Sequence, residues 1–162
     1  MPKRARCPYC DRLFNRDVLD SHVQKCKYRT QKNRSDKQHR TLIVDGNNVA
    51  YHLSQQGKPK MKNLILAYRS LKRTGFRPIF VVSAALMHNI DKPLSLDEFM
   101  QSAEVVQAPR GSDDDLRIIL LAKKLNAPIV SNDRFLDWLE KYPWISSQLR
   151  NYRMTPSGLI LI

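Results

Sequence analysis

The fold is decided by ten residues, 41–50, which read TLIVDGNNVA. Residues 41–45 form the run of aliphatic and β-branched side chains that is typical of a short buried strand, and Gly46 ends it. This strand closes on Asp45, and a carboxylate at the end of a buried strand is costly unless another group pairs with it. The stretch therefore predicts a central strand that carries a carboxylate to the edge of a sheet.

Short apolar strands alternate with helical stretches through the rest of the chain. Residues 61–74, for example, place apolar side chains at 61, 64, 65, 68 and 71, which is helical spacing. Such alternation predicts an α/β fold in which a parallel sheet is sandwiched by helices. Besides 41–45, we expect strands at 78–82, 103–107, 128–130, 152–155 and 158–162, and helices at 61–74, 95–101, 113–126 and 134–141.

Acidic residues gather after three of the predicted strands, at the edge where a parallel sheet places its functional cleft. One aspartate of the second group is explained by capping of the next helix, and Asp133 could cap a helix at 134–141. The others would repel one another unless a divalent cation lies between them. Ligands that are all oxygen favour Mg²⁺ or Mn²⁺ over zinc. The aspartates concerned are Asp45, then Asp113, Asp114 and Asp115, then Asp133 and Asp137.

The charge of the chain points to a polyanionic partner. Its 162 residues include 28 Lys plus Arg against 15 Asp plus Glu, a net charge of +13, and a balance this basic favours nucleic acid. Carboxylates that hold a hard metal inside a basic protein indicate phosphodiester hydrolysis. We expect no membrane partner, since the longest apolar runs reach fewer than half of the ~20 residues that span a bilayer. The start lacks an apolar signal core, so we expect a cytoplasmic protein, or a nuclear one in a eukaryote.

A second metal site is predicted at the amino end, in residues 1–28. Cys7, Cys10, His22 and Cys26 follow the spacing C-x2-C-x11-H-x3-C, which can close four ligands around one tetrahedral Zn²⁺. Chance clustering of these four residues is the alternative. The stretch resembles a C2H2-type zinc finger in which Cys26 replaces the second histidine. We therefore expect a small ββα zinc finger whose folding depends on zinc.

A basic connector, residues 29–40, follows the finger and lacks aliphatic side chains. It is either a solvated linker or an arm that grips a phosphate backbone, and both can hold for one segment. The candidates for RNA contact in it are Arg34, Lys37 and Arg40.

Three ordered motifs relate residues 41–162 to a known family. They are LIVDGNNVA at 42–50, DDLRIILLA at 114–122 and IVSNDRFLD at 129–137. Together they resemble the NYN branch of the PIN-like nucleases, most closely the Regnase type of endoribonuclease. The resemblance implies a PIN-like (NYN) nuclease domain over 41–162 that cleaves single-stranded or loop RNA with a divalent metal.

The resemblance also implies roles for individual residues. Asp45, Asp115 and Asp133 would bind Mg²⁺ or Mn²⁺, and Asp137 would complete the acidic pocket. Asp114 would support them, and Asn48 would orient Asp45. Further candidates for phosphate contact near this site are Arg110, Arg117, Lys123 and Arg134.

Two departures from the family stand out. Regnase-type proteins carry a CCCH finger after the nuclease domain, whereas this chain has its finger before it. The loop at 109–112 is also short where the family usually has a longer basic loop that grips RNA. The basic amino-terminal segment could take over that grip.

Two alternatives to the nuclease hypothesis stay open on the sequence. One is a catalytically weak RNA-binding or ribosome-associated module whose acids are vestigial. The other is a structure-specific DNA nuclease, although such enzymes usually have more acids and a helical arch. The finger would assist RNA binding or contact a partner protein, such as one of the ribosome. The sequence also leaves open whether two chains pair as a homodimer.

Overall fold

The computed structural model describes residues 4–162, apart from the side chains of residues 28–39 and 55. The chain divides into two compact units, Met1–His39 and Arg40–Ile162. None of the described helices combines the length and the apolar character that crossing a bilayer requires.

The second unit is built on a sheet of five parallel strands. In spatial order these are β5 (Val105–Ala108), β4 (Arg77–Ser83), β3 (Thr41–Asp45), β6 (Ile129–Val130) and β7 (Leu149–Arg150). All five residues of β3 are buried, because the strand lies in the middle of the sheet. The predicted parallel sheet with 41–45 as its central strand is therefore confirmed.

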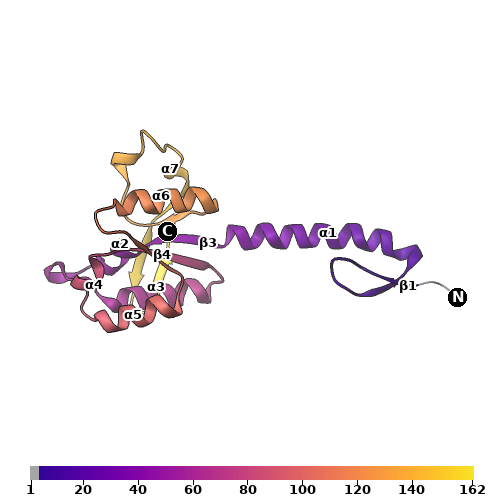
Figure 1. Cartoon of the computed structure of the whole chain (residues 1–162), viewed down its shortest axis with the longest axis horizontal. Helices are drawn as coiled ribbons and strands as arrows, with labels where there is room; N and C mark the ends of the chain where they lie inside the picture. Colours follow the sequence, from indigo (N-terminus) through magenta and orange to yellow (C-terminus); the bar gives the residue numbers. More distant parts are fainter. Residues whose placement is uncertain (1–3) are drawn as a thin grey trace. The chain divides into compact units, whose positions relative to one another are not determined.

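Alternate residues of β3 enter two hydrophobic cores on opposite faces of the sheet. Leu42 and Val44 pack into the core that contains α3 (Met61–Arg73) and α5 (Pro93–Ser102). Ile43 packs into the core that contains α6 (Asp114–Leu125) and α7 (Ile145–Gln148). Figure 1 shows α6 and α7 on one side of the sheet and α3 and α5 on the other. The predicted sandwich of helices around the sheet is confirmed.

Short elements fill the connections of this unit. They are α2 (Gly46–Tyr51), the 3-10 turn η1 (Gln55–Gly57), α4 (Leu86–Asn89) and the 3-10 turn η2 (Leu136–Trp138). The sequence did not predict α2, α4 or β7, since elements of two to six residues show too few side chains for a period to emerge.

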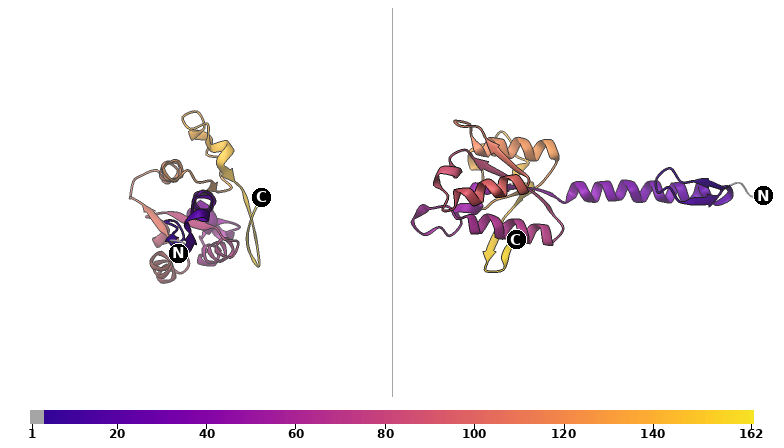
Figure 2. Two further views of the ribbon diagram at one scale, coloured as in Figure 1. Left: turned by 90° about the vertical axis from the view of Figure 1, so that its right-hand side faces the viewer. Right: turned by 60° about the horizontal axis from the view of Figure 1, so that its bottom comes forward.

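The carboxyl-terminal strands form a hairpin of their own. β8 (Tyr152–Thr155) and β9 (Gly158–Leu161) pair antiparallel and lie beside α3 (Figure 2). The Leu159 N–H donates to Ser70 Oγ at 2.9 Å. A Cβ at Gly158 would lie 2.7 Å from Ser70 Cβ, so glycine permits this close approach. The predicted strand, turn and strand are confirmed, as a separate two-stranded sheet.

The helix predicted at 134–141 is wrong. Phe135 has a left-handed backbone, with φ of 52°, and only η2 follows it. Asp133 Oδ1 accepts the Phe135 N–H at 2.9 Å, a turn that redirects the chain. The turn places the Phe135 side chain in the core under α6, where it is 2% exposed. Burial of this ring outweighs the helical spacing of its neighbours.

The first unit has the predicted ββα arrangement. β1 (Arg4–Arg6) and β2 (Leu13–Asn15) pair antiparallel, and α1 (Arg16–His39) follows them. The Phe14 ring stacks on His22 with ring centroids 3.8 Å apart. The backbone of α1 continues to His39, so the segment expected as a connector continues the helix of the finger.

Gly46, the first residue of α2, is a sensitive point of this fold. An alanine Cβ there would lie 2.6 Å from Val82 Cγ1 and 2.8 Å from the Val81 carbonyl oxygen, which as backbone cannot move aside. We expect Gly46→Ala to lower the free energy of unfolding by about 2 kcal/mol. Urea denaturation followed by the fluorescence of Trp138 and Trp144, both in this unit, measures the change.

The control for this substitution is Glu98→Ala, on an exposed position of α5. It should change stability by less than about 0.5 kcal/mol. Equal stability of the two variants would contradict the close packing of β3 and β4 at Gly46.

Candidate functional site

Asp45 is the buried centre of a group of aspartates at the carboxyl edge of the sheet. Its side chain is 6% exposed. Oδ1 accepts the Asn48 N–H at 3.0 Å, and Oδ2 accepts the Ser131 hydroxyl at 2.9 Å. Burial raises the pKa of Asp45 to about 6; these two hydrogen bonds lower it, and the charges of Asp133 and Asp114 raise it again. The carboxylate is held firmly but remains costly to ionise.

The first turn of α6 contributes two carboxylates to this group. Asp113 caps the helix, because its Oδ1 accepts the N–H groups of Asp115 and Leu116 at 2.9 and 3.2 Å. That cap explains one aspartate of the three. Asp114 Oδ2 accepts a hydrogen bond from Asn47 Nδ2 at 3.2 Å. Burial, followed by the charge of Asp113, raises the pKa of Asp114.

Asp115 differs from its neighbours because its carboxylate accepts no hydrogen bond from any described residue. Burial raises the pKa of Asp115 to about 6, and the charges of Asp45, Asp133, Asp113 and Asp114 add to the rise. A half-buried carboxylate that accepts no hydrogen bond and faces like charges is costly to ionise. It is the residue of this group whose position most needs an external cation.

Asp133 enters the group from the end of β6. Its N–H donates to Ser131 Oγ at 3.1 Å, so one buried hydroxyl contacts both Asp133 and Asp45. Asp133 itself is exposed. Its Oδ1 also accepts the Phe135 N–H. Asp133 therefore both caps a turn and adds a negative charge near Asp45. From the sequence, capping and metal binding were alternative interpretations of this residue.

Asp137 lies on η2, is exposed, and has no hydrogen bond to the other aspartates. The turn at Phe135 replaces the helix on which Asp137 was expected. Its part in an acidic pocket stays a prediction.

A network of amides and one tyrosine surrounds the aspartates. The Asn48 side chain accepts from the Asn132 N–H at 3.1 Å and from the Tyr152 hydroxyl at 2.8 Å. Asn48 therefore orients Asp45 through its backbone N–H, and its side chain joins α2 to β6 and β8. Asn132 in turn accepts from the Tyr152 N–H and donates to the Tyr152 carbonyl, both at 3.0 Å. Burial, followed by the charge of Asp45, raises the pKa of Tyr152, which keeps the phenol protonated.

Sequence reasoning missed Tyr152 and Asn47 as parts of this site. Asn47 Oδ1 accepts the Ser83 N–H at 3.0 Å while its amide group binds Asp114, so it ties β4 to α6. Its place in the DGNN turn was the available signal. Tyr152 lies 104 residues beyond its partner Asn48, and no local motif marks it.

No basic side chain among the described residues forms an ion pair with the aspartates. The two ion pairs among the described residues join Arg6 to Asp11 and Arg77 to Glu104, and neither touches the site. The donor set consists only of carboxylates with lone pairs that the hydrogen bonds leave unused, which suits a hard divalent ion. The aspartate oxygens do not converge as closely as the cysteine and histidine group of the first unit does.

The basic residues predicted to contact RNA divide into two groups. Three of them are exposed and follow or precede the aspartates closely in sequence. Arg110 lies on the loop before α6, Arg117 lies in the first turns of α6, and Arg134 directly follows Asp133. Lys123 lies two turns along α6, where it lines a pocket with Trp144 and Asn126.

Arg40 precedes β3, and its carbonyl accepts the Arg77 N–H where β4 begins. Arg40 therefore lies at the amino-terminal end of β3, whereas Asp45 lies at its carboxyl-terminal end. Lys123 does not lie beside the aspartates either, because it is two turns further along α6. The side chains of Arg34 and Lys37 lie outside the described residues.

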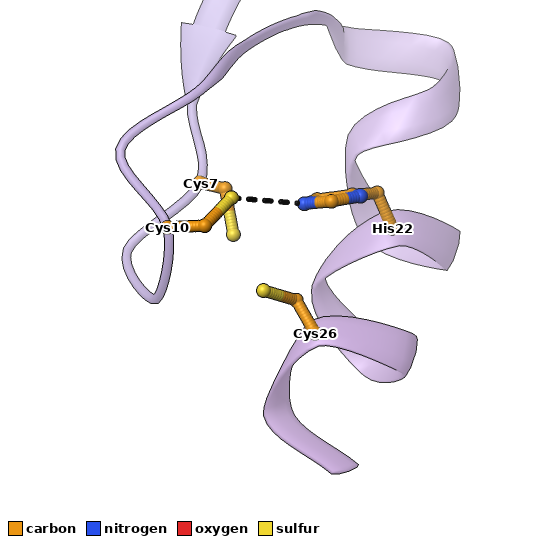
Figure 3. Close-up of side chains that lie close together, drawn as sticks. All are labelled: Cys7, Cys10, His22 and Cys26. Atoms are coloured by element: carbon orange, nitrogen blue, oxygen red, sulfur yellow. Dashed lines mark hydrogen bonds between the residues drawn. The ribbon is translucent and has the colours of Figure 1, made fainter. Parts of the chain in front are cut away.

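The four predicted ligands of the first unit face one another (Figure 3). Cys7 and Cys10 lie on the turn between β1 and β2, and His22 and Cys26 lie one helical turn apart on α1. Their ligand atoms all lie within 4.8 Å of one another, and Cys10 Sγ is 3.3 Å from His22 Nε2. Burial and the thiols of Cys10 and Cys7 raise the pKa of Cys26 to about 11. Three sulfurs and one imidazole nitrogen form a donor set that suits tetrahedral zinc.

Comparisons with known proteins bear on the family and the fold of the chain. Residues 38–157 match the family model described as "Zc3h12a-like Ribonuclease NYN domain". No curated protein sequence matches the chain. Two structures of nuclear protein-only RNase P 2 from Arabidopsis thaliana share the fold, at TM-scores of 0.61 and 0.60 and sequence identities of 18% and 19%. They cover 99% and 100% of this chain, which spans 41% and 42% of theirs.

Burial of the aspartates, together with their mutual repulsion, predicts an unusual dependence of stability on pH. Asp45 and Asp115 have a pKa of about 6 in the folded chain against an ordinary 3.8. The folded state therefore binds these protons more tightly, and stability without metal falls as pH rises from about 4 to about 7. The buried Asp45 alone accounts for about 3 kcal/mol of that fall.

Asp115→Asn should reduce this fall by about 1 kcal/mol, because it removes one of the facing charges and breaks no hydrogen bond. The measurement is urea denaturation in EDTA from pH 4 to pH 8, followed by the fluorescence of Trp138 and Trp144, which report on the second unit alone. Parallel pH profiles for the variant and the wild type would show that the carboxylates do not repel one another.

Proposed function

The chain belongs to the Zc3h12a-like ribonuclease NYN family, and from that premise we propose that it is a metal-dependent endoribonuclease acting on single-stranded or loop RNA. The observation that carries the proposal is the group of Asp45, Asp115 and Asp133, which no basic side chain of the described chain neutralises. Burial and neighbouring like charges make such a group costly to ionise, and a cation from solution would offset that cost.

Mg²⁺ or Mn²⁺ would be held by Asp45, Asp115 and Asp133. When bound, the ion supplies a polarised phosphoryl oxygen and a water of lowered pKa. The chain itself fixes the carboxylates before any ligand arrives. Ser131 and the Asn48 N–H hold Asp45 in one orientation, and Asn47 holds Asp114 at the rim. Asp115 accepts no hydrogen bond from the described residues, which leaves both of its oxygens available to that ion.

RNA is the substrate that the charge distribution supports. The exposed Arg117 and Arg134 lie close in sequence to the aspartates of α6 and β6, where they would attract phosphates. We extend the proposal to the first unit, in which Cys7, Cys10, His22 and Cys26 would hold Zn²⁺. The finger and the basic segment after it would then assist in binding RNA or a protein associated with RNA.

The decisive assay compares wild type with Asp115→Asn on labelled single-stranded RNA, duplex RNA and single-stranded DNA. We expect wild type with Mn²⁺ to cleave single-stranded RNA and to stop when EDTA is added. Asp115→Asn should lower kcat by a factor of at least ~10². Glu98→Gln, on the exposed face of α5, should cleave like wild type.

Other results of this assay would redirect the proposal. Cleavage that survives both EDTA and Asp115→Asn would sink the mechanism of metal-bound carboxylates. Cleavage of DNA alone would favour a DNA nuclease, and RNA binding without cleavage would favour a binding module.

Zinc in the first unit has its own test. Purified protein should hold one zinc per chain by elemental analysis, and Cys26→Ser should reduce that content and lower helical circular dichroism. The fluorescence of Trp138 and Trp144 should not change, because both lie in the second unit. Wild type free of zinc with the same helix content would contradict a finger whose folding depends on metal.

A further inference from the structure

A pocket beside the aspartates has no part in the chemistry described so far. It encloses about 330 Å³ at the carboxyl ends of β4 and β5. Its volume lies at the small end of the range for small-molecule sites, ~300–1,000 Å³, and corresponds to about one nucleotide unit. The residues that line it are Ser83, Ala84, Ala85, His88, the loop 109–112 and Asp114.

The pocket is joined to the active site through two residues. Asp114 belongs both to its lining and to the group of aspartates. Asn47 binds two residues of the pocket lining, because it accepts the Ser83 N–H and donates to Asp114. A chain whose phosphate lies at the aspartates would therefore have a neighbouring unit within reach of this pocket.

Arg110 brings a positive charge to this pocket, whose lining also includes the carboxylate of Asp114. Arg110 is exposed and takes part in neither ion pair of the described residues. Its Nη2 lies 3.1 Å from His88 Nε2. A guanidinium has donors only, so Nε2 of His88 is the acceptor in this contact. The contact fixes Arg110 without neutralising it, and four further N–H groups remain for an anion.

The walls of the pocket suit a flat or small group. Ala84, Ala85 and Pro109 offer apolar surface without long side chains. Gly111 has a φ of 74°, and a Cβ there would meet no atom within 4 Å, so the entrance is open on that side. A ribose or base can pack on such a surface while the phosphate of the same nucleotide binds the Arg110 guanidinium. Arginine is a preferred residue for binding phosphate.

We propose that this pocket binds the nucleotide next to the cleaved phosphate of RNA, with Arg110 on the phosphate of that nucleotide and His88 as the residue that positions Arg110. The inference rests on the proposed function, since it assigns a place to the substrate of the same site. It gives the short loop 109–112 a role in gripping RNA through one placed arginine.

Binding can be tested apart from cleavage. The probe is a fluorescein-labelled, mixed-sequence single-stranded RNA, and the protein is the full chain with Asp115→Asn, which leaves Arg110 and His88 in place. Adding Arg110→Ala should weaken binding by about 3- to 10-fold and reduce the slope of log K against log salt by ~0.7. Arg73→Ala, at the exposed end of α3 before β4 begins, is the matched control and should change binding by less than about twofold.

Variants of His88 test its positioning role. His88→Ala should weaken binding by about 3-fold, and His88→Gln, which keeps an acceptor for Arg110, should restore most of it. In the Arg110→Ala background, His88→Ala should have no further effect. Equal losses in both backgrounds would show that His88 acts independently of Arg110.

Cleavage by the otherwise wild-type protein supplies the second readout. RNAs shortened one nucleotide at a time should show one step at which kcat/KM falls sharply for wild type and much less for Arg110→Ala. If wild type cleaves RNA but Arg110→Ala changes neither kcat/KM nor the salt slope, the pocket proposal is wrong and the nuclease proposal stands. If no RNA is cleaved or bound, the proposed function itself fails.

Discussion

The burial of one carboxylate is the constraint on which the second unit depends. Asp45 ends a strand that lies in the middle of the sheet and is covered on both faces, so its charge has little access to water. Such a group persists only with strong hydrogen bonds or a cation nearby. The Asn48 N–H and the Ser131 hydroxyl supply the hydrogen bonds, and both come from elements that immediately follow a strand. The order of the strands thus determines which residues can satisfy Asp45.

Asparagines join the elements that meet around Asp45. Asn47 connects β4 to α6, and Asn48 connects α2 to the residue after β6 and to β8. An amide can accept and donate at once without adding charge, so it joins strand ends where a further carboxylate would increase the repulsion. Asn132, with two hydrogen bonds to the backbone of Tyr152, extends the network to the terminal hairpin. The hairpin lies outside the parallel sheet, yet it helps to fix the site.

The sequence predicted the features that depend on neighbours along the chain. The apolar run before Asp45, the helical spacing in 61–74 and the cysteine spacing all act locally, and the structure confirms each. The prediction from sequence failed where contacts between residues far apart in the chain determine the local structure. Phe135 breaks the expected helix because its ring is needed in the core under α6.

Candidate residues of the site show the same division between local and distant causes. Lys123 was proposed for its charge, but it lies two turns along α6 from the aspartates at the start of that helix. Tyr152 was missed because only the folded chain brings its hydroxyl to Asn48. The contact of Arg110 with His88 likewise joins two loops that no sequence motif relates. The sequence therefore predicts which residues lie at the carboxyl-terminal ends of the strands, and the packing determines which of them contact one another.

Asp45 and Asp115 both make the site costly to ionise, but the protein stabilises only one of them with hydrogen bonds. Asp45 and Asp114 accept hydrogen bonds from the protein, whereas Asp115 accepts none and faces the charges of its neighbours. Burial of apolar side chains in the two hydrophobic cores that flank the sheet stabilises the fold and offsets the electrostatic cost of these carboxylates. A ligand that binds only the folded state stabilises it in proportion to its affinity. A cation bound by Asp115 would therefore gain affinity from the repulsion that it removes, and without such a cation the same carboxylate makes the chain less stable.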